Sequence, residues 1–385
     1  MTRNDDCELP EPFLEMLAES GLDAIPQAIS LLLNLAALAE RQAYLRAAPY
    51  ERSSERADHA NGFKSKTLNT RVGPVNVSIP QVRNGDFYPS SLDKGIRSER
   101  ALKLAIAEMY VQGVSTRRVT AITEQLCGVS VSSTQVSRAA AELDTVLENW
   151  RRRPLGRFRY VFLDALYAKV RRDGCVQDAA VLLAVGVDEA GKRQIMGISV
   201  SLSEHEVHWR EFLKSLVDRG LAGVELITSD AHQGLKAACR AVFGGVPWQR
   251  CQFHLQQNAQ AYIPKLDMKS QVASDIRAVF NAEDRDHADQ KLKQVADKYR
   301  QTAPRLATWM EENLPEGLTV FSFPGGHRRL LRTSNGLERI NKEIRRRTRV
   351  CGLFPNEASC LRLVTAVVME ISDDWQTGRS YLTFD

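Results

Sequence analysis

Residues 160–170 of the chain are Tyr160-Val-Phe-Leu-Asp164-Ala-Leu-Tyr-Ala-Lys-Val170, an apolar run with one acidic side chain inside it. Such a run, rich in aromatic and β-branched residues, is typical of a buried strand. A second run, Val224–Ser229, has the same character and is followed at once by Asp230. Within the first run, the most apolar part is Tyr160-Val-Phe-Leu-Asp164, and we expect the strand to end at Asp164, as the second ends at Asp230. Each predicted strand would then deliver a carboxylate at its tip.

The segment between and after these two runs is typical of an α/β domain. Two further strands, Ala179–Val187 and Gln194–Ser201, are joined by Asp188-Glu-Ala-Gly-Lys192, which predicts a hairpin. Apolar residues then recur at helical spacing in His208–Arg219 and again in His232–Phe243. Three adjacent strands, a helix and then a strand–helix pair is the order expected of a ribonuclease-H-like domain. No purely physical argument excludes other α/β topologies.

The chain before this domain contains helices and one β-ribbon. Pro10–Arg46 carries apolar residues at helical spacing, and the polar stretch Arg52–Asn61 is typical of a linker. Alternating apolar residues with Gly73-Pro74 punctuation predict a short β-ribbon over Arg71–Arg83.

The passage from Gly113 to Arg138 has the layout of a helix-turn-helix. Two short helical stretches each follow a serine or threonine that can cap them, and Gly128 lies between them. A plain helical hairpin with exposed arginines has the same spacing. The candidate DNA contacts are Arg117 and Arg118 in the first helix and Ser132, Ser133, Gln135 and Arg138 in the second.

Charge and composition narrow the class of protein. A length of 385 residues suggests two or three domains, and a net charge of +5 is only a weak sign of an anionic partner. The distribution of charge is more informative, because basic blocks at 151–159, 327–332 and 345–349 lie far apart along the chain. A long surface that follows phosphates needs such blocks, although solvated helix faces explain any single one.

No feature of the sequence indicates a membrane or an oxidising compartment. No segment approaches the roughly 18 uninterrupted apolar residues of a membrane span, and the first residues lack the pattern of a secretory signal. The 7 cysteines form no regular framework, which favours a reducing compartment. We therefore expect a soluble, cytoplasmic protein.

The two aspartates are candidate metal ligands. If their strands are neighbours in one sheet, the carboxylates meet within a few ångströms, which is tolerable only where cations bridge them. Oxygen ligands favour Mg²⁺ or Mn²⁺ over zinc. Two such ions, roughly 3.5–4 Å apart, can activate a water or a 3′-hydroxyl and stabilise the leaving oxygen of a phosphodiester. Isolated aspartates are also common where strands lead into loops, so spacing alone leaves this hypothesis open.

Glu338 is the candidate third acid, in a predicted helix over Ser334–Arg349. A carboxylate beside a basic stripe suits a site that holds cations and docks a polyanion. The alternative is a capping box, in which Asn335 caps the helix and Glu338 returns the bond. The stripe on the same face consists of Lys342, Arg345 and Arg349, and Arg346 is a further candidate DNA contact.

From about Asn61 to Leu382 the chain resembles the mutator-type insertion-sequence transposases of bacteria, which resemble the transposase of the plant Mutator elements. In that family the catalytic acids are an Asp, Asp, Glu set, which the motifs place on Asp164, Asp230 and Glu338. The matching motifs, in order, are Gly113-Val-Ser-Thr-Arg117, Leu163-Asp-Ala-Leu-Tyr-Ala-Lys-Val-Arg171, Trp209-Arg-Glu-Phe-Leu213, Arg219-Gly-Leu221, Ser229-Asp-Ala-His232, Gln249-Arg-Cys-Gln-Phe-His254, Arg332-Thr-Ser-Asn335, Glu338-Arg339, Arg345–Arg349 and Phe354-Pro355.

The resemblance implies a DNA transposase that binds the terminal inverted repeats of an insertion sequence and cleaves DNA without a covalent enzyme intermediate. We expect the freed 3′-hydroxyl to join to target DNA, with two Mg²⁺ or Mn²⁺ ions at the acids. Two element ends must be brought together, so we expect a homodimer on DNA. The expected division is 1–60, a helical N-terminal region; 61–155, a DNA-binding region with the ribbon and the helix-turn-helix; 156–250 with 325–385, the ribonuclease-H-like catalytic domain; and 251–324, an all-helical insertion.

Cys251 and His254 form a Cys-x-x-His motif next to this predicted insertion. With His232 and Cys239 they would supply four zinc ligands, but a lone Cys-x-x-His lacks the second close pair of a structural zinc site. The resemblance instead places the motif near the active site, where His254 would orient a carboxylate or approach the scissile phosphate. Trp209, at helical spacing with Phe212, is expected in the core rather than as a platform for a base.

Two other functions are compatible with these residues. A sequence-specific binding protein would use the helix-turn-helix and keep the α/β part as a dimerisation scaffold, without metal-dependent cleavage. A structure-specific nuclease of the same fold would cut branched DNA without terminal repeats and would not join ends.

Overall fold

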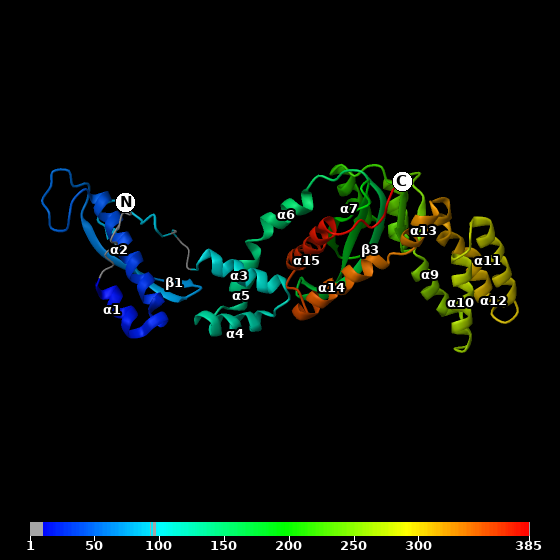
Figure 1. The fold of residues 1–385 in the computed structure, drawn as a ribbon, viewed down its shortest axis with the longest axis horizontal. Helices are drawn as coiled ribbons and strands as arrows, with labels where there is room; N and C mark the ends of the chain where they lie inside the picture. Colours follow the sequence, from blue (N-terminus) through cyan, green and yellow to red (C-terminus); the bar gives the residue numbers. More distant parts are fainter. Residues whose placement is uncertain (1–10, 93, 95–97, 385) are drawn as a thin grey trace, which may run out of the picture. The chain divides into compact units, whose positions relative to one another are not determined.

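The chain divides after Leu143 into two structural units, Met1–Leu143 and Asp144–Asp385. The computed structural model describes residues 11–92, 94 and 98–384, so the first ten residues of the predicted N-terminal region lie outside the described chain. The expected mixture of helical regions with an α/β region is confirmed (Figure 1).

The first unit opens with helices that pack on a two-stranded ribbon. These elements are α1 (Glu11–Ser20), the 3-10 turn η1 (Gly21–Ala24), α2 (Ile25–Leu45), β1 (Ala60–Thr70) and β2 (Gly73–Val82). The strands are antiparallel, and Ile29 and Leu33 of α2 pack against Val75 and Val77 of β2. The ribbon is longer than the predicted Arg71–Arg83, which supplies little more than its second strand. β1 was missed because polar side chains occupy most of its positions.

Three helices complete the first unit: α3 (Arg100–Val111), α4 (Thr116–Cys127) and α5 (Ser133–Ala141). Ser115 caps α4 by accepting from the backbone N–H of Arg118, and Gly128 ends that helix with a φ of 62°, a conformation that glycine adopts without strain. Ser132 caps α5. The predicted pair of serine-capped helices around Gly128 is therefore present, and their apolar faces share a core with α3.

A five-stranded sheet forms the centre of the second unit. Its strands are β3 (Phe158–Arg172), β4 (Cys175–Asp188), β5 (Arg193–Ser201), β6 (Leu226–Ser229) and β7 (Trp248–Arg250), in the order β5-β4-β3-β6-β7. β3, β4 and β5 are antiparallel neighbours, whereas β6 is parallel to β3 and β7 is parallel to β6. The predicted hairpin across Asp188–Lys192 is confirmed as the link between β4 and β5.

The prediction that Asp164 terminates its strand is wrong. β3 continues to Arg172 and turns into β4 through Asp173 and Gly174, whose φ angles are 50° and 80°. Two consecutive residues with positive φ make the tight turn whose twist matches paired strands, and Asp-Gly is a preferred sequence for it. Pairing with β4 therefore keeps β3 extended past the acid.

Helices cover both faces of this sheet. α7 (Glu206–Asp218) and α8 (Gln233–Val242) pack on one face, where Val161 and Leu163 of β3 meet Trp209 and Leu213. Trp209 is a fully buried core residue, as predicted. Side chains alternate along a strand, so Asp164 points to the other face, which α14 (Asn335–Cys351) and α15 (Glu357–Thr377) cover. α6 (Asp144–Arg152) leads into the sheet and is held to α15 by Arg362.

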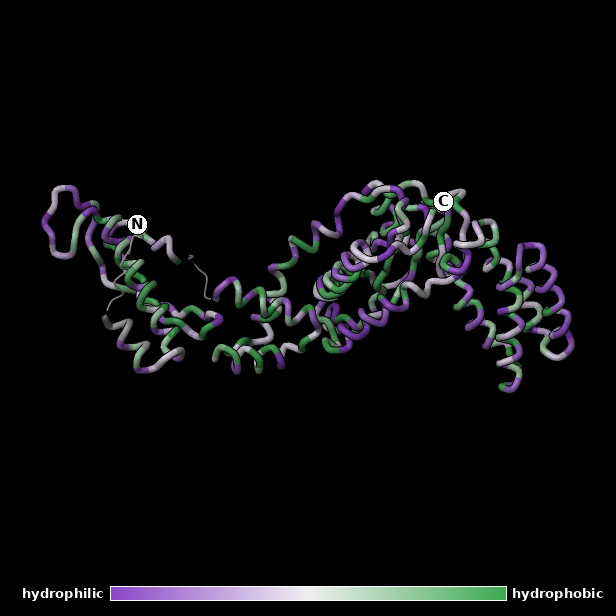
Figure 2. Tube along the Cα trace, viewed as in Figure 1, coloured by the Kyte–Doolittle hydropathy of each residue, from purple (hydrophilic) through white to green (hydrophobic). Residues whose placement is uncertain are grey.

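The chain from Gln252 to Leu331 is built from helices. In chain order these are α9 (Gln252–Ala259), η2 (Gln260–Tyr262), α10 (Met268–Phe280), α11 (Arg285–Tyr299), α12 (Pro304–Asn313), η3 (Leu314–Gly317), η4 (Thr319–Ser322) and α13 (Gly325–Leu331). Apolar and polar positions alternate at helical spacing through this part, and α14 is mostly hydrophilic along its trace (Figure 2). Within the part of the chain that the structure describes, every helix is too short or too polar to span a bilayer.

We predict that Leu213→Ala destabilises the second unit by about 2–5 kcal/mol, because the side chain is fully buried between α7 and the sheet and its loss leaves a cavity. The matched control is the exposed neighbour Lys214→Ala, for which we expect a change of about 0.5 kcal/mol or less. Urea unfolding followed by circular dichroism measures both. Equal effects of the two changes would contradict the packing of α7 on the sheet.

Candidate active site

The pairing of β3 with β6 sets Asp164 and Asp230 side by side. Phe162 of β3 pairs with Thr228 of β6 in the parallel register. Asp164 comes two residues after Phe162, and Asp230 comes two residues after Thr228. Parallel neighbours lie about 4.8 Å apart, and equivalent positions on them point to the same face. The structure therefore brings these two predicted acids together, and the negative charge of Asp230 contributes to raising the pKa of Asp164.

Asp164 is largely withdrawn from water. Burial is the main cause that raises the pKa of its carboxyl, and two hydrogen bonds oppose it. Asn341 Nδ2 donates to Asp164 Oδ2 at 2.8 Å, and the backbone N–H of Ala165 donates to Oδ1 at 3.0 Å. An ionised Asp164 thus needs a cationic partner more than an exposed aspartate does.

Asp230 opens the loop from β6 to α8. Its Oδ1 accepts from the backbone N–H of Ala231 at 2.7 Å. The preceding Ser229 is fixed from two directions: the backbone N–H of Cys251 donates to its carbonyl at 2.8 Å, and Trp248 Nε1 donates to its hydroxyl at 2.9 Å. β7 and the residue after it therefore hold Ser229, which directly precedes the second acid, Asp230.

The Cys251–His254 pair lies next to the two acids. Cys251 is fully buried, and the backbone N–H and hydroxyl of Ser334 lie 3.4 and 3.3 Å from its sulfur. The pKa of His254 is raised to about 9, mainly by its hydrogen bond to the Cys251 sulfur, and the negative charges of Asp230 and Asp164 contribute to this rise. His254 therefore places a positive charge near both carboxylates at neutral pH.

Glu338 lies on α14 and does not meet the two aspartates. Its side chain is exposed, one helical turn before Asn341, which contacts Asp164. Within residues 11–92, 94 and 98–384, no three His, Cys, Asp or Glu side chains gather into a group that could hold a metal ion. The capping-box alternative is wrong, because the helix begins at Asn335 with Ser334 as its N-cap, so Glu338 is past the position that returns the bond.

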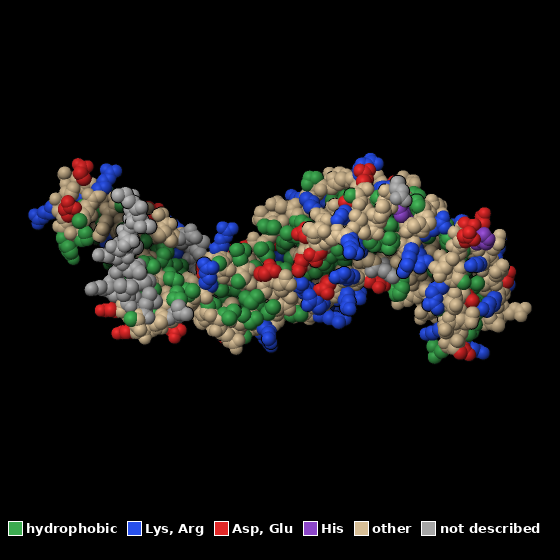
Figure 3. All heavy atoms as spheres, in the orientation of Figure 1, with side chains coloured by type: hydrophobic (Ala, Val, Ile, Leu, Met, Phe, Trp, Pro, Cys, Tyr) green, Lys and Arg blue, Asp and Glu red, His purple; other side chains and the backbone are tan. Residues whose placement is uncertain are grey.

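The predicted basic stripe is present on the surface of α14 (Figure 3). Lys342, Arg345 and Arg349 are exposed, and none of them forms an ion pair within the described chain. Arg346 is also exposed but lies 2.9 Å from Glu343. Arg347, by contrast, is buried, with its guanidinium 3.5 Å from Glu370. The three unpaired cations are the ones free to meet an anion.

The first unit holds the other candidate DNA contacts. Arg117, Arg118 and Arg138 are exposed, as a binding role requires. Ser132 and Gln135 are exposed too, but they form a capping box: Gln135 Oε1 accepts from the backbone N–H of Ser132 at 2.7 Å. Their oxygens therefore accept hydrogen bonds that stabilise α5, and the amide nitrogen of Gln135 and the hydroxyl hydrogen of Ser132 are left to donate to a base.

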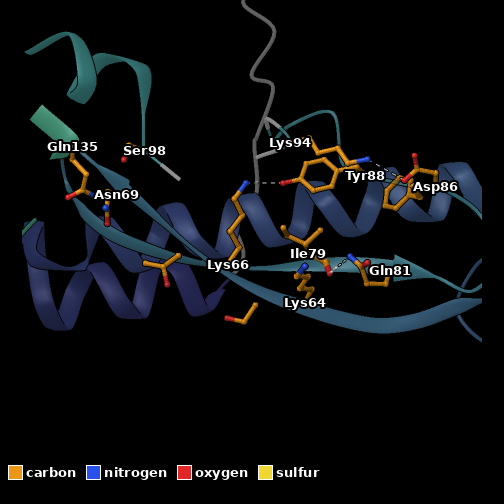
Figure 4. Close-up of a pocket in the computed structure, with 13 residues that line it drawn as sticks. Lys64, Lys66, Asn69, Ile79, Gln81, Asp86, Tyr88, Lys94, Ser98 and Gln135 are labelled. Carbon is orange, nitrogen blue, oxygen red and sulfur yellow. Dashed lines mark hydrogen bonds and ion pairs between the residues drawn. The ribbon is translucent and has the colours of Figure 1, made fainter. Parts of the chain in front are cut away.

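A basic hollow, here the ribbon groove, lies beside β1 in the same unit (Figure 4). Its volume is about 780 Å³, and Lys64, Lys66 and Lys94 line it together with Gln135. Lys66 Nζ donates to Tyr88 Oη at 2.9 Å. The sequence interpretation missed these lysines, and the signal that could have found them is their spacing of two in a ribbon strand, which places Lys64 and Lys66 on one face.

Residues 13–378 match the family described as "Transposase, Mutator family". The chain is 56% identical over 371 residues to the transposase for insertion sequence element IS406 of Burkholderia multivorans, covering 96% of each protein. It is 41% identical over 367 residues to the transposase for insertion sequence element ISRM5 of Rhizobium meliloti, covering 95% of this chain and 92% of that protein. A comparison of structures matches one chain of the simian T-cell lymphotropic virus intasome, solved by cryo-EM in complex with the PP2A regulatory subunit B56 gamma. The match covers 53% of this chain and 64% of that chain at 13% sequence identity. Its TM-score of 0.19 is too low to bear on the fold.

We predict that Asp164→Asn raises the melting temperature of the protein in EDTA by roughly 2–4 °C, the shift that about 1 kcal/mol produces in a unit of this size. Burial and then the charge of Asp230 disfavour the ionised carboxyl, and asparagine removes that charge. Asp374→Asn, an exposed aspartate on α15, serves as the control and should leave the melting temperature unchanged. A lower melting temperature for Asp164→Asn would contradict a destabilising charge at this position.

Proposed function

The chain belongs to the Mutator family of transposases, and on that basis we propose that it binds the terminal inverted repeats of an insertion sequence and cuts and joins DNA at Asp164, Asp230 and Glu338. Its relatives are transposases of insertion sequences, so DNA is its partner and DNA transposition its activity. The observation that carries the proposed chemistry is the pairing of β3 with β6, which sets two carboxylates side by side.

The sheet topology supports a ribonuclease-H-like catalytic domain. The first three strands form an antiparallel meander, and β6 and β7 extend the sheet in parallel from β3. This is the strand order expected of that fold: three adjacent antiparallel strands, followed by parallel strands that are each reached through a helix. In this proposal the helices from α9 to α12 are an insertion between the second aspartate and the glutamate.

The donor set at the site suits divalent magnesium or manganese. Asp164 and Asp230 offer only oxygen atoms, which these ions prefer, and two carboxylates held together on one face of a sheet repel each other without a cation. We propose that these two acids and Glu338 hold two ions. Bound there, such ions would generate a nucleophile from water or a 3′-hydroxyl and stabilise the leaving oxygen of a phosphodiester.

The neighbouring side chains hold this site in place. Asn341 and the N–H of Ala165 fix the carboxylate of Asp164, and the loop to α8 fixes Asp230. His254 adds a positive charge that partly offsets the two acids. For phosphoryl transfer most of the protein's contribution is positioning and electrostatic stabilisation, and these contacts provide it.

In this proposal, Glu338 joins the two aspartates when DNA binds to α14. Its side chain is exposed, on the helix that also carries the basic stripe. Phosphates drawn to Lys342, Arg345 and Arg349 would lie beside Glu338, because residues three or four apart share a helix face. The stripe thus couples docking of the polyanion to the third acid.

The first unit is the proposed reader of the terminal repeats. α4 and α5 form the helix pair of a helix-turn-helix, in which the second helix enters the major groove. Arg138 and the amide nitrogen of Gln135 are the candidate base contacts on α5, while Arg117 and Arg118 are candidate phosphate contacts on α4. The ribbon groove, which Gln135 also lines, adds Lys64 and Lys66. Two repeats must be joined, so we propose that the protein acts as a homodimer on DNA.

We predict that Asp230→Asn and Glu338→Gln each reduce cleavage and joining by about a hundredfold or more, since loss of a group that only supports a metal ligand already costs roughly 10–100-fold. The assay uses purified protein, Mg²⁺ and a labelled fragment that carries the element's terminal repeat. Binding to this fragment should remain, and the control Glu312→Gln, exposed on α12, should cut and join normally.

Other results of this assay identify the rival functions. Binding by the native chain without cleavage in Mg²⁺ or Mn²⁺ would indicate a DNA-binding scaffold. Cleavage of branched DNA without joining of ends would indicate a nuclease. Full activity of Glu338→Gln would exclude Glu338 as the third acid while leaving the two aspartates in place.

We predict that Arg345→Ala lowers the slope of the logarithm of DNA affinity against the logarithm of salt concentration by about one, as expected for one lost phosphate contact. Arg345 is exposed and unpaired within the described chain. The control is Lys269→Ala, exposed on α10, which should leave the slope unchanged. An unchanged slope for Arg345→Ala would remove the stripe from the DNA interface.

A further inference from the structure

Asn341 is a buried amide in direct contact with one of the two aspartates. It lies on α14 three residues after Glu338, and only 9% of its surface is exposed. Its Nδ2 donates to Asp164 Oδ2 at 2.8 Å. Its other polar atom, Oδ1, is also buried and has no hydrogen-bond partner within the described chain.

An unsatisfied buried carbonyl oxygen is unusual, because most buried polar atoms in proteins are hydrogen-bonded. The orientation of this amide follows from its neighbour: turning it over would set Oδ1 against the carboxylate oxygen of Asp164, an acceptor against an acceptor. Nδ2 of Asn341 therefore donates to Asp164. Oδ1 lies on the same planar amide and accepts no hydrogen bond within the described chain.

Amide oxygens are ordinary ligands for hard divalent cations. At this site a neutral oxygen has a particular advantage over a further carboxylate, since Asp164 and Asp230 already repel each other. It adds a ligand without adding negative charge. Asp164, Asp230 and the positively charged His254 lie near this region. A cation held here would have the two carboxylates and the neutral amide oxygen as ligands, with the imidazolium of His254 nearby.

We propose that Asn341 belongs to the cation site, with Nδ2 orienting Asp164 and Oδ1 supplying a neutral oxygen to the divalent ion that Asp164 and Asp230 bind. The inference rests on the proposed function, because it requires the two aspartates to hold a cation. It gives Asn341 a second role, as a cation ligand, in addition to its hydrogen bond to Asp164. A residue that merely tied α14 to β3 would need its nitrogen but not its oxygen.

The test measures Mn²⁺ binding to the full-length protein, without DNA, by the electron paramagnetic resonance signal of the free ion. Asn341→Leu removes both polar atoms at similar volume and should weaken Mn²⁺ binding by roughly 10–100-fold, the usual effect of losing a group that supports a metal ligand. Asn341→Asp should bind Mn²⁺ at least as tightly as the native chain, because it replaces a neutral oxygen with an anionic one.

Melting temperatures in EDTA and in Mn²⁺ separate this role from a structural one. In EDTA, Asn341→Leu removes a buried oxygen with no partner but also the donor to Asp164, so the quantity compared is the rise in melting temperature on adding Mn²⁺. Asn341→Asp should melt lower than the native protein in EDTA, because a third carboxylate joins two others. Added Mn²⁺ should restore Asn341→Asp and leave Asn341→Leu almost unchanged. Thr348→Ala, two turns further along the same face of α14, should bind Mn²⁺ as the native chain does.

The variants distinguish failure of this inference from failure of the proposed function. If Asp164→Asn and Asp230→Asn lose Mn²⁺ binding while Asn341→Leu keeps native affinity, Asn341 is only a tie between α14 and β3 and the inference is overturned. A native chain that binds no Mn²⁺, or whose affinity is unaffected by either aspartate change, overturns the inference together with the proposed cation site.

Discussion

The parallel pairing of β3 with β6 is the constraint on which the site depends. It sets Tyr160 beside Leu226 and Phe162 beside Thr228, and because side chains alternate with a period of two, a slip of one residue would turn one aspartate to the opposite face. The apolar residues between α7 and the sheet hold that register. Asp164 then points towards α14 because Val161 and Leu163 point into the core. Packing on one face of the sheet therefore decides the chemistry available on the other.

Much of this sheet could be predicted from the sequence, because its buried strands are long apolar runs. The runs at Tyr160 and at Val224 locate β3 and β6 to within a few residues, and the link through Asp188 to Lys192 locates the hairpin of β4 and β5. Two features escaped. β7 has only three residues, Trp248–Arg250, too few to show any period. The second is the turn from β3 into β4 at Asp173-Gly174, a local signal that the apolar pattern does not contain.

The candidate site was predictable only in part. Asp164 and Asp230 are recognisable as acids that follow apolar runs, and Glu338 as a member of a motif shared with known transposases. Asn341 was missed as a site residue, although Leu337, Ile340 and Ile344 mark the buried face of α14 and Asn341 shares that face. The sequence does not tell which residue that face meets. The same holds for Ser334, whose contact with Cys251 joins positions far apart in the chain. Such contacts exist only after the sheet and α14 have packed, so they follow from tertiary structure.

The bond between Asn341 and Asp164 joins positions 177 residues apart. A ribosome releases the chain from its N-terminus, so the unit with α4 and α5 is complete long before α14 leaves the exit tunnel. The strands of the five-stranded sheet end at Arg250, but the contact of Asp164 with α14 must wait for nearly all of the chain. Products of incomplete translation or of a frameshift before α14 would retain the proposed reader of the terminal repeats and lack the proposed third acid. On the proposed function, they would occupy the ends of the element without cutting them, and so act as competitors of the full-length protein.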